Sequence, residues 1–349
     1  MRVGLFGARA DDRGLGRLTL DFHRHMRPDR TLVVDMGPHA HQFTQHLDRY
    51  PDATVVPFNA GVFDEAVMRR FFAGLDVAVM YETAYDHRAY DIARAAGCRT
   101  VLMAMPEFHR HLTEQLPTPD VVWVPTVWRL GMFPADTRLV PVPVDPEDAL
   151  APPASPSPVL RVLHVAGHRA TGDRNGTLAF LRALRLVRQP MAVRVTTQDP
   201  GIPSVAGIKH LATFDQRRPT DHWRLYDQAD ILVMPRRYGG LSLPVHEAMA
   251  AGLGVAMTDC DPNPATWPIC PIRCRPGLTI RTPGGTVVLN APDPGHLAAV
   301  LDRLAASPAE VADLKARARL WAAANTWDVL RPLYRAELER AVASSTAAA

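Results

Sequence analysis

The chain has 349 residues, of which 47% are hydrophobic and 21% are charged. This balance is typical of a globular protein, and the length predicts two domains at roughly 100–200 residues each. No apolar run approaches the roughly 18 residues of a membrane-spanning helix, and the N-terminus lacks the long apolar stretch and the cleavage site of a signal peptide. These features favour a cytoplasmic protein over a membrane or secreted one.

The net charge of +3 is divided unevenly along the chain. Residues 1–145 contain 16 arginines against 18 aspartates and glutamates, which gives −2 and leaves +5 for the remainder. The positive part is the one better suited to a ligand that carries phosphate groups.

The four cysteines are too few for a disulfide scaffold in a chain of this length. Cys270 and Cys274 stand four residues apart, but no second pair of cysteines or histidines completes the pattern of a zinc site. We therefore expect structural or incidental thiols, a reducing compartment and no bound metal.

Residues 1–145 alternate short apolar runs with amphipathic stretches, such as the expected helices Leu15–His25 and Asp64–Phe72. Such alternation favours a parallel sheet that is covered on both faces by helices. The expected strands are Arg2–Phe6, Thr31–Asp35, Thr54–Pro57, Val77–Tyr81, Thr100–Met103 and Val121–Val124. This region is predicted to form an N-terminal Rossmann-like domain.

Residues 146–158 are rich in proline, alanine and serine, and we expect a linker there because prolines exclude a helix interior and a central strand. The alternation then restarts in residues 159–330, the expected second Rossmann-like domain. Its expected strands and helices are Val159–Val165, Asn175–Arg188, Ala192–Thr196, His222–Gln228, Ile231–Met234, Pro244–Ala251 and Gly254–Thr258. A last helical region runs from Pro294 to about Val342.

The most informative stretch is Leu225–Thr258. A buried strand runs into the glycines Gly239 and Gly240, and a helix opens at Leu243 or at the next residue, which is a proline suited to a first helical turn. The amides of such a loop and helix N-terminus form an anion site suited to a diphosphate. Glu247, expected in the first turn, could accept hydrogen bonds from two hydroxyls of a ribose.

Leu225–Thr258 resembles the donor-site signature of retaining GT-B glycosyltransferases, and of glycosyltransferase family 4 (glycosyl transferases group 1) in particular. The positions that match this signature are Leu225, Tyr226, Ala229, Asp230, Pro235, Gly240, Leu243, Pro244, Glu247, Ala248, Met249, Ala250, Gly252 and Val255. The resemblance implies an α/β chain of the GT-B type, in which two Rossmann-like domains face each other across a cleft. It also implies that residues 331–349 supply a helix that packs back on the first domain, ahead of a tail that we expect to be disordered.

The resemblance implies that the donor is held by the loop and by the start of the helix, and in the family Glu247 contacts the ribose. The expected donor contacts are Tyr238, Gly239, Gly240, Leu241, Ser242, Leu243 and Glu247. Gly239 departs from the family, which has a glutamate there that touches the donor sugar. This departure leaves three alternatives: an unusual donor sugar, replacement of the glutamate by Arg237 or Tyr238, or a copy that has lost catalysis.

A second match lies in residues 164–176, after the first strand of the second half. The family has an arginine and a lysine in this loop that reach the diphosphate. Gly167 takes the place of the glycine that precedes the family's arginine, and Arg169 and Arg174 could supply the two charges because a guanidinium group binds phosphate through two hydrogen bonds. Both arginines are expected to bind the donor and to stabilise the departing diphosphate.

In the first half, Gly14 and Gly16 form a strand–glycine–helix turn, where the family has a glycine-rich turn near the transferred sugar. Glu82 and His87 follow the strand Val77–Tyr81, close to where the family often has a His-Asp element. Either side chain could position an acceptor hydroxyl or act as the general base.

Asp259–Asp261 mimics a metal-binding Asp-x-Asp, but that element belongs to a different fold, and a turn explains it here.

We therefore expect the transfer of a sugar, with retention at the anomeric carbon, from a nucleotide-sugar that contains UDP or GDP. No cofactor or metal is expected. The acceptor is left open between a small molecule, a lipid or glycan, a protein and a modified base in DNA, as in phage-type DNA glycosyltransferases. A non-catalytic protein that binds nucleotide-sugars and a GT-B epimerase are the competing functions.

Overall fold

The computed structural model describes residues 1–11, 13–37, 44–112, 114–145, 157–167, 173–197, 199, 201–202, 210–215, 222–259 and 267–344. The predicted linker, apart from its last two residues, and the end of the predicted tail lie outside these ranges. The chain divides into two compact units. Unit 1 comprises Met1–Val142, Thr282–Gly285 and Trp327–Ala349, and unit 2 comprises Pro143–Arg281 and Thr286–Thr326.

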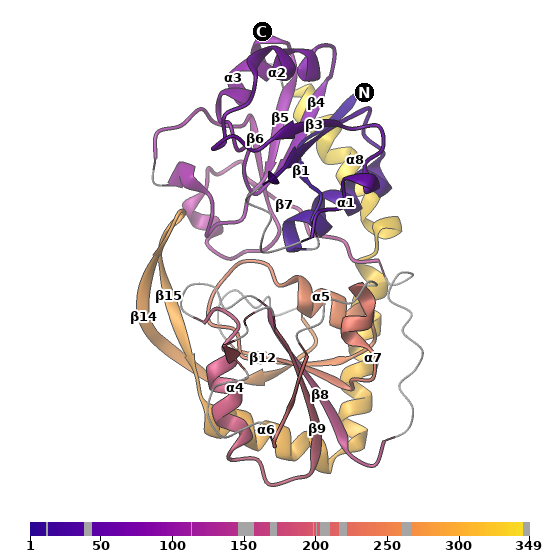
Figure 1. Ribbon diagram of the computed structural model, residues 1–349, viewed down its shortest axis with the longest axis vertical. Helices are drawn as coiled ribbons and strands as arrows, with labels where there is room; N and C mark the ends of the chain where they lie inside the picture. The colour runs from indigo at the N-terminus through magenta and orange to yellow at the C-terminus, as the bar shows by residue number, and fades with distance from the viewer. Residues whose placement is uncertain are drawn as a thin grey trace. The chain divides into compact units, whose positions relative to one another are not determined.

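Unit 1 is built on a seven-stranded parallel sheet with the order β3-β2-β1-β4-β5-β6-β7 (Figure 1). The strands are β1 (Val3–Arg9), β2 (Arg30–Asp35), β3 (Thr54–Pro57), β4 (Val77–Tyr81), β5 (Arg99–Met103), β6 (Val121–Val124) and β7 (Arg138–Leu139). The helices are α1 (Gly14–Met26), α2 (Glu65–Phe72), α3 (Arg88–Ala95) and α8 (Trp327–Ala343).

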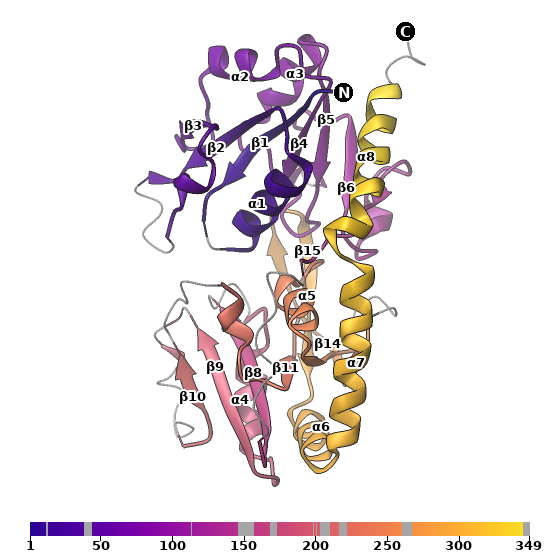
Figure 2. The same cartoon turned by 90° about the vertical axis from the view of Figure 1, so that its right-hand side faces the viewer.

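Helices cover both faces of this sheet, as its fully apolar central strands require. On one face, Phe72 of α2 stacks on Phe6 of β1 with ring centroids 5.0 Å apart. On the other face, Phe22 of α1 contacts Tyr81 of β4 and Tyr334 of α8. Figure 2 shows α8 running alongside the sheet, and it packs on β4 and β5. The last helix of the chain is thus part of the core of unit 1.

Unit 2 repeats the arrangement with a six-stranded parallel sheet of order β10-β9-β8-β11-β12-β13. The strands are β8 (Leu160–Gly167), β9 (Met191–Thr197), β10 (Thr213–Asp215), β11 (Ile231–Met234), β12 (Gly254–Thr258) and β13 (Ile269–Ile272). The helices are α4 (Thr177–Leu184), α5 (Leu243–Ala250), α6 (Pro294–Ala306) and α7 (Pro308–Ala324), and His222–Tyr226 forms a 3₁₀ turn, η6.

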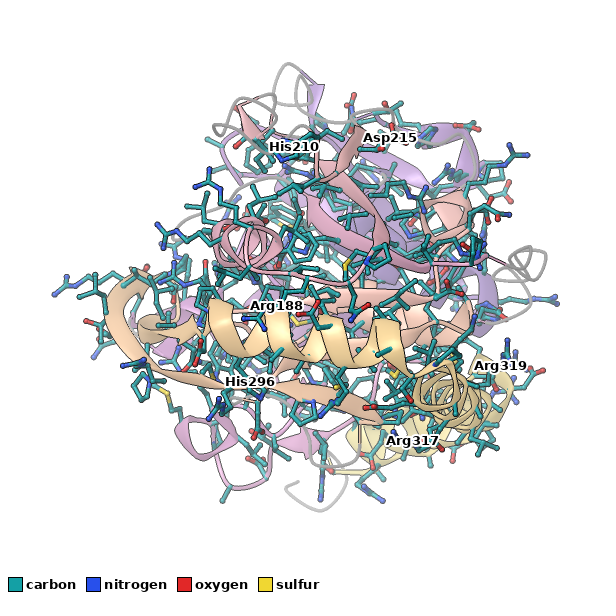
Figure 3. All side chains as sticks on the ribbon, turned by 90° about the horizontal axis from the view of Figure 1, so that it is seen from below. Arg188, His210, Asp215, His296, Arg317 and Arg319 are labelled. Atoms are coloured by element: carbon teal, nitrogen blue, oxygen red, sulfur yellow. The ribbon has the colours of Figure 1, made fainter. Side chains whose placement is uncertain are left out.

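The two faces of the second sheet have separate apolar cores. Phe180 of α4 and Leu301 of α6 are buried in one core, and Met249 of α5 and Ala318 of α7 are buried in the other. Figure 3 looks at this unit from the α6 side, with Arg188 and His296 beside that helix. The backbone N–H of Arg188 donates to the Asp302 carboxylate of α6, which fixes this end of the unit.

The predicted strands are confirmed with end points that differ by at most three residues, and the α/β architecture is confirmed with them. The predicted helix Asn175–Arg188 is too long, because the left-handed Gly176 precedes its start and the helix ends at Leu184. The region from Pro294 to Val342 is three helices, interrupted first at Ser307, whose side chain caps α7. A two-stranded sheet, β14 (Cys274–Thr282) with β15 (Gly285–Pro292), was not expected.

No helix in the part of the chain that the structure describes is long and apolar enough to span a membrane.

Candidate functional site

Each sheet has one switch point. It lies between two neighbouring strands from which successive connections lead in opposite directions across the sheet. In unit 1 it lies between β1 and β4, and in unit 2 it lies between β8 and β11. Open α/β sheets bind ligands outside the carboxyl ends of their strands at such a point. The loops after β8 and β11 therefore define the candidate site of unit 2, and the loops after β1 and β4 define that of unit 1.

The two loops of unit 2 are fixed to each other. The N–H of Arg237, after β11, donates to the carbonyl oxygen of Arg174, after β8, over 2.8 Å. Gly176 has a φ of +70°, and a Cβ atom there would lie 1.8 Å from the carbonyl oxygen of Pro235. Glycine is therefore required at position 176 for its backbone conformation and for this close approach. The loop that carries Arg174 is held in place before any ligand arrives.

Two positive side chains converge beside Gly239. A Cβ atom on Gly239 would lie 2.3 Å from Nη2 of Arg236 and 2.4 Å from Nη2 of Arg174. The Arg174 guanidinium also lies over the ring of Tyr238, 5.4 Å from its centroid, and Arg236 is only 2% exposed. Two guanidinium groups this close repel each other, so an anion that contacts both would be stabilised strongly.

The space that the family's glutamate would need at position 239 is therefore filled by arginine side chains. Gly239 has a φ of +115°, a conformation that a residue with a Cβ atom rarely adopts. Arg236 stands where the family signature has a serine, and it was not among the predicted site residues. That departure from the signature was the signal that could have identified it.

Other predicted donor residues surround these two arginines. Gly167 ends β8 with a φ of +60°, and Arg169 lies outside the described residues. Ser242 precedes α5, and its side chain makes no capping hydrogen bond to the helix. The backbone N–H groups at the start of a helix have no partner within the helix and carry a partial positive charge. Five consecutive predicted donor residues are buried at this point: Tyr238, Gly239, Gly240, Leu241 and Ser242.

Glu247 lies in the second turn of α5 rather than in the first, because the helix begins at Leu243. Its carboxylate is 5% exposed and accepts hydrogen bonds from the Tyr226 hydroxyl at 2.5 Å and from Nε2 of His222 at 2.9 Å. Both partners lie on η6. Tyr226 matches the signature, but it was not predicted to be a partner of the glutamate.

His246 lies next to Glu247 and is buried between the rings of Trp267 and Trp321. Among the residues that the structure describes, neither of its ring nitrogens has a hydrogen-bond partner. Burial, with a smaller contribution from the Arg236 charge, lowers the pKa of His246 to about 4. The folded protein therefore holds this ring in its neutral form.

His246→Leu is expected to reduce the loss of stability that the protein suffers on acidification. Because the pKa is lower in the folded state than its ordinary value of 6.5, the unfolded chain binds the proton first, and the free energy of unfolding falls as the pH drops from about 6.5 to about 4. At neutral pH the variant should gain about 1 kcal/mol, because a buried polar ring is removed. Urea unfolding at several pH values measures both effects, and His210→Leu, at an exposed histidine, is the control. If the free energy of unfolding depends on pH equally in His246→Leu and in the wild type, the pKa of His246 is not lowered by folding.

In unit 1, Gly14 is the first residue of α1, and Gly16 approaches the loop after β1. A Cβ atom on Gly16 would lie 2.0 Å from the carbonyl oxygen of Asp11. The Asp11 carboxylate is buried, accepts from the Arg13 N–H at 3.0 Å and pairs with Arg9. Glycine at position 16 is thus needed to pack the helix against this loop.

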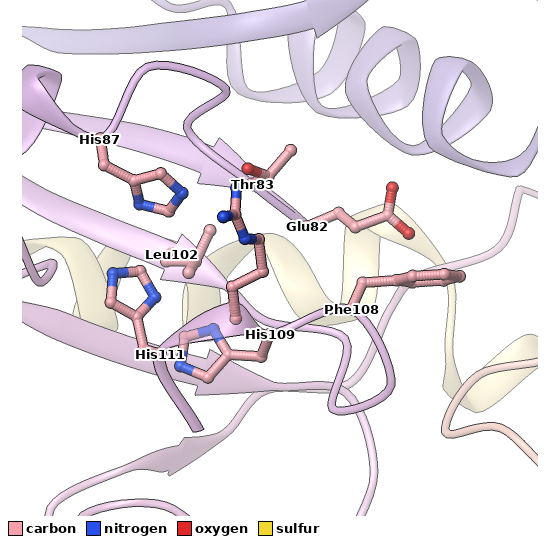
Figure 4. A pocket seen from close by; sticks show the side chains of 8 residues that line it. Glu82, Thr83, His87, Leu102, Phe108, His109 and His111 are labelled. Carbon is pink, nitrogen blue, oxygen red and sulfur yellow. The ribbon is translucent and has the colours of Figure 1, made fainter. Parts of the chain in front are cut away.

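Glu82 and His87 line a small cavity after β4, but the Glu82 side chain points away from the His87 ring (Figure 4). Glu82 has a φ of +64°, an uncommon conformation for a residue with a Cβ atom. His87 faces two further histidines, since its ring lies 4.9 Å from that of His111, which lies 4.8 Å from that of His109. The cavity measures about 10 Å³, which is room for one water molecule.

The three histidines are poor bases in this environment. Burial, reinforced by His111 and Arg110, lowers the pKa of His87 to about 4, and burial lowers that of His109 to about 3. A general base works best with a pKa near the operating pH. Over the described ranges, no group of three or more His, Cys, Asp or Glu side chains is arranged to hold a metal ion. Neutral imidazole rings are better suited to forming hydrogen bonds with an acceptor substrate than to removing a proton from it.

Comparison with known proteins agrees with this geometry. Residues 160–305, most of unit 2, match the family model of glycosyl transferases group 1. No curated protein sequence is close enough to the chain to count as a relative.

Solved structures extend the likeness to the whole chain. The chain is similar to a glycosyltransferase from Rickettsia africae, with a TM-score of 0.70, 11% identity and 98% of each chain covered. It is also similar to Anabaena HepE in complex with UDP and glucose, with a TM-score of 0.71, 12% identity and coverage of 97% and 100%. Sucrose-phosphate synthase from Thermosynechococcus elongatus gives a TM-score of 0.70 at 14% identity, with coverage of 99% and 100%. The chain therefore has the GT-B fold, and the match of residues 160–305 to glycosyl transferases group 1 supports a transferase enzyme.

Proposed function

We propose that the chain transfers a sugar from a nucleoside-diphosphate sugar, bound in unit 2, to an acceptor molecule. The observation that carries this proposal is the convergence of the Arg174 and Arg236 guanidinium groups beside Gly239, next to the start of α5. A diphosphate there would receive hydrogen bonds from both guanidinium groups and favourable charge from the helix N-terminus.

The same arrangement would promote the reaction. When the bond between the sugar and the diphosphate breaks, negative charge develops on the departing diphosphate, and fixed positive groups that stabilise it lower the barrier. The carbonyl oxygen of Arg174 accepts a hydrogen bond from the N–H of Arg237, so the backbone that carries this side chain is fixed before the ligand binds. We propose that this charge replaces a metal ion and that the anomeric configuration is retained, as the resemblance to family 4 implies.

Glu247 is the proposed ribose ligand. Its hydrogen bond from Tyr226 is buried, whereas its second partner, His222, has a side chain that is 32% exposed. A ribose hydroxyl could replace His222 and donate to the same carboxylate oxygen. We propose UDP as the nucleotide, because HepE, which has the same fold, binds UDP.

The proposed donor sugar carries an acidic group. Where the family places a glutamate that accepts hydrogen bonds from sugar hydroxyls, this chain places two guanidinium groups, which can only donate. Each guanidinium group has five N–H donors, so a carboxylate on the sugar could accept hydrogen bonds from them in addition to the diphosphate. UDP-glucuronate is therefore expected to bind more tightly than UDP-glucose, and equal affinity or the reverse order would contradict this part of the proposal.

The acceptor site is proposed at the carboxyl end of β4, where Glu82 could receive a hydroxyl group. Glu82 is half-buried and its side chain lies outside the histidine cluster. The carboxylate would orient the acceptor hydroxyl or take up its proton.

Thermal unfolding with UDP, GDP, ADP, TDP and CDP, each with its sugars, tests the donor site. A ligand at about 100 times its Kd stabilises the folded state by about 2.7 kcal/mol, which raises the midpoint by several degrees. Glu247→Ala should abolish the shift, because the ribose contact is lost. Asp313→Ala, which removes an exposed carboxylate from α7, should leave the shift unchanged.

If no nucleotide stabilises the wild type, the proposed donor site is wrong. If a nucleotide-sugar binds but is neither hydrolysed nor transferred when a panel of acceptors is supplied, the chain is a binding protein that has lost catalysis.

A further inference from the structure

A second concentration of positive charge lies within unit 1, in a groove between α1 and α8. The groove has a volume of about 640 Å³. It is lined by Arg24, His25, Met26, Arg27, Arg331 and Arg335, and we refer to it as the arginine groove. The first four residues form the last turn and the C-cap of α1, and the other two stand four residues apart on α8.

Among the residues that the structure describes, the wall of the groove has no acidic member. Arg24, Arg27 and Arg335 make no ion pair with any residue in the described ranges. Arg331 pairs with Asp328 at 2.9 Å, but this aspartate has a side chain that is 80% exposed and lies outside the groove. The groove therefore keeps most of its positive charge.

Helix stabilisation explains only part of this cluster. Basic residues at the end of α1 interact favourably with the negative end of that helix dipole. Arg331 and Arg335, however, are the fifth and ninth residues of the seventeen in α8, where the dipole of their own helix gives them no advantage. Like charges four residues apart destabilise a helix. An anion in the groove would remove this repulsion.

A contact between two aromatic rings joins the two helices that form the groove. The ring of His25 stacks on that of Trp327, the first residue of α8, with centroids 5.0 Å apart and planes at 6°. The contact fixes the end of α1 against the start of α8. The four guanidinium groups are therefore presented on two helices whose spacing is set by packing.

The arginine groove is separate from the reaction site of its own unit. The switch point lies at the carboxyl end of β1, where α1 begins, whereas the groove lies at the opposite end of that helix. A helix of 13 residues is about 20 Å long. A ligand in the groove would thus not reach the site where a sugar is transferred.

We propose that the arginine groove binds a small anion that carries two or more phosphate groups. Each guanidinium group can bind a phosphate through two parallel hydrogen bonds. The volume lies within the range of roughly 300–1,000 Å³ that is typical of small-molecule pockets. The ligand would act as a second-site effector or as an anchoring group, and this proposal does not depend on the proposed transferase mechanism.

Calorimetric titration with tripolyphosphate tests the proposal. Because this probe could also bind at Arg174, every protein carries Arg174→Gln as a common background. Adding Arg24→Gln and Arg335→Gln should weaken the remaining binding at least tenfold. Both arginines are exposed, so these changes should cost little stability, and an unchanged unfolding midpoint checks this.

The control adds Arg70→Gln and Arg138→Gln instead, which removes two exposed arginines of unit 1 outside the groove. It should bind tripolyphosphate as the background protein does. An equal loss in both double variants would overturn the proposal, because it would indicate a general effect of net charge. The absence of any binding in the Arg174→Gln background would overturn it as well.

Vesicle flotation distinguishes a soluble ligand from a lipid headgroup. Vesicles of phosphatidylglycerol and phosphatidylcholine are compared with vesicles of phosphatidylcholine alone. No groove-dependent recruitment is expected. If the protein does not bind tripolyphosphate but is recruited to the anionic vesicles in a way that Arg24→Gln and Arg335→Gln abolish, the groove binds a membrane surface and the proposal of a small anion is wrong.

Discussion

Arg174→Gln is expected to weaken the binding of UDP by about 30- to 100-fold, which corresponds to roughly 2–3 kcal/mol for a hydrogen bond to a charged group. Arg174 brings one of the two guanidinium groups that converge beside Gly239, and its loop is fixed to β11 through its backbone. Glutamine keeps much of the side-chain length but removes the charge. Calorimetric titration of UDP measures the loss.

The rate should fall further than the affinity, because charge on the leaving diphosphate grows as the bond breaks. Release of UDP from a UDP-sugar in the absence of an acceptor measures this rate. Arg182→Gln, which changes an exposed arginine of α4 in the same unit, is the matched control and should alter neither quantity. Unchanged UDP affinity in Arg174→Gln would remove this arginine from the site.

Gly176→Ala is expected to have the largest effect on stability, with a loss of about 3 kcal/mol or more. A Cβ atom at this position meets the Pro235 carbonyl oxygen at 1.8 Å, so the loops after β8 and β11 would have to separate. The left-handed backbone conformation alone costs about 1–2 kcal/mol for a residue with a Cβ atom. Urea unfolding of the variant measures the total.

Gly97→Ala separates the two causes. Gly97 has a φ of +74°, close to the +70° of Gly176, but a Cβ atom there would meet nothing within 4 Å. Gly97→Ala should therefore lose only the free energy that the left-handed backbone conformation costs a residue with a Cβ atom. If both variants lose the same free energy, the close approach of Gly176 to Pro235 does not exist, and the two loops of the candidate site are not held as described.

The order of strands and helices could be predicted well from the sequence because both sheets are parallel and buried. The strand Val77–Tyr81 is apolar at every position, and the structure buries all five of its residues. Such runs are visible without knowledge of the fold. β14 could not be predicted in the same way, because Pro276 and Gly277 interrupt it and most of its side chains are exposed.

The candidate site was predictable only where the signature is intact. Glu247 could be identified from its motif, but its partner His222 stands 25 residues earlier, and only the fold brings the two together. Arg236 was overlooked because the signature has a small polar residue at that position. Gly239 has no side chain, and this leaves room for the Arg236 guanidinium group. The fit between the two residues can be seen only in the folded structure.

The histidine cluster was likewise only partly visible in the sequence. His87 was selected because it follows a strand end. His109 and His111 come from the loop after the next strand, and parallel pairing of β4 with β5 brings them beside it. Burial, reinforced by His111 and Arg110, lowers the pKa of His87, which changes its expected role from proton acceptor to neutral hydrogen-bonding group.

Hydrogen exchange of the wild type with and without saturating UDP locates the bound nucleotide in the chain. We expect slower exchange in peptides that contain Asp173–Thr177 and Pro235–Glu247, the two segments that meet at the switch point of unit 2. Exchange that is unchanged in both segments while UDP is bound would place the nucleotide elsewhere and contradict the assignment of the donor site.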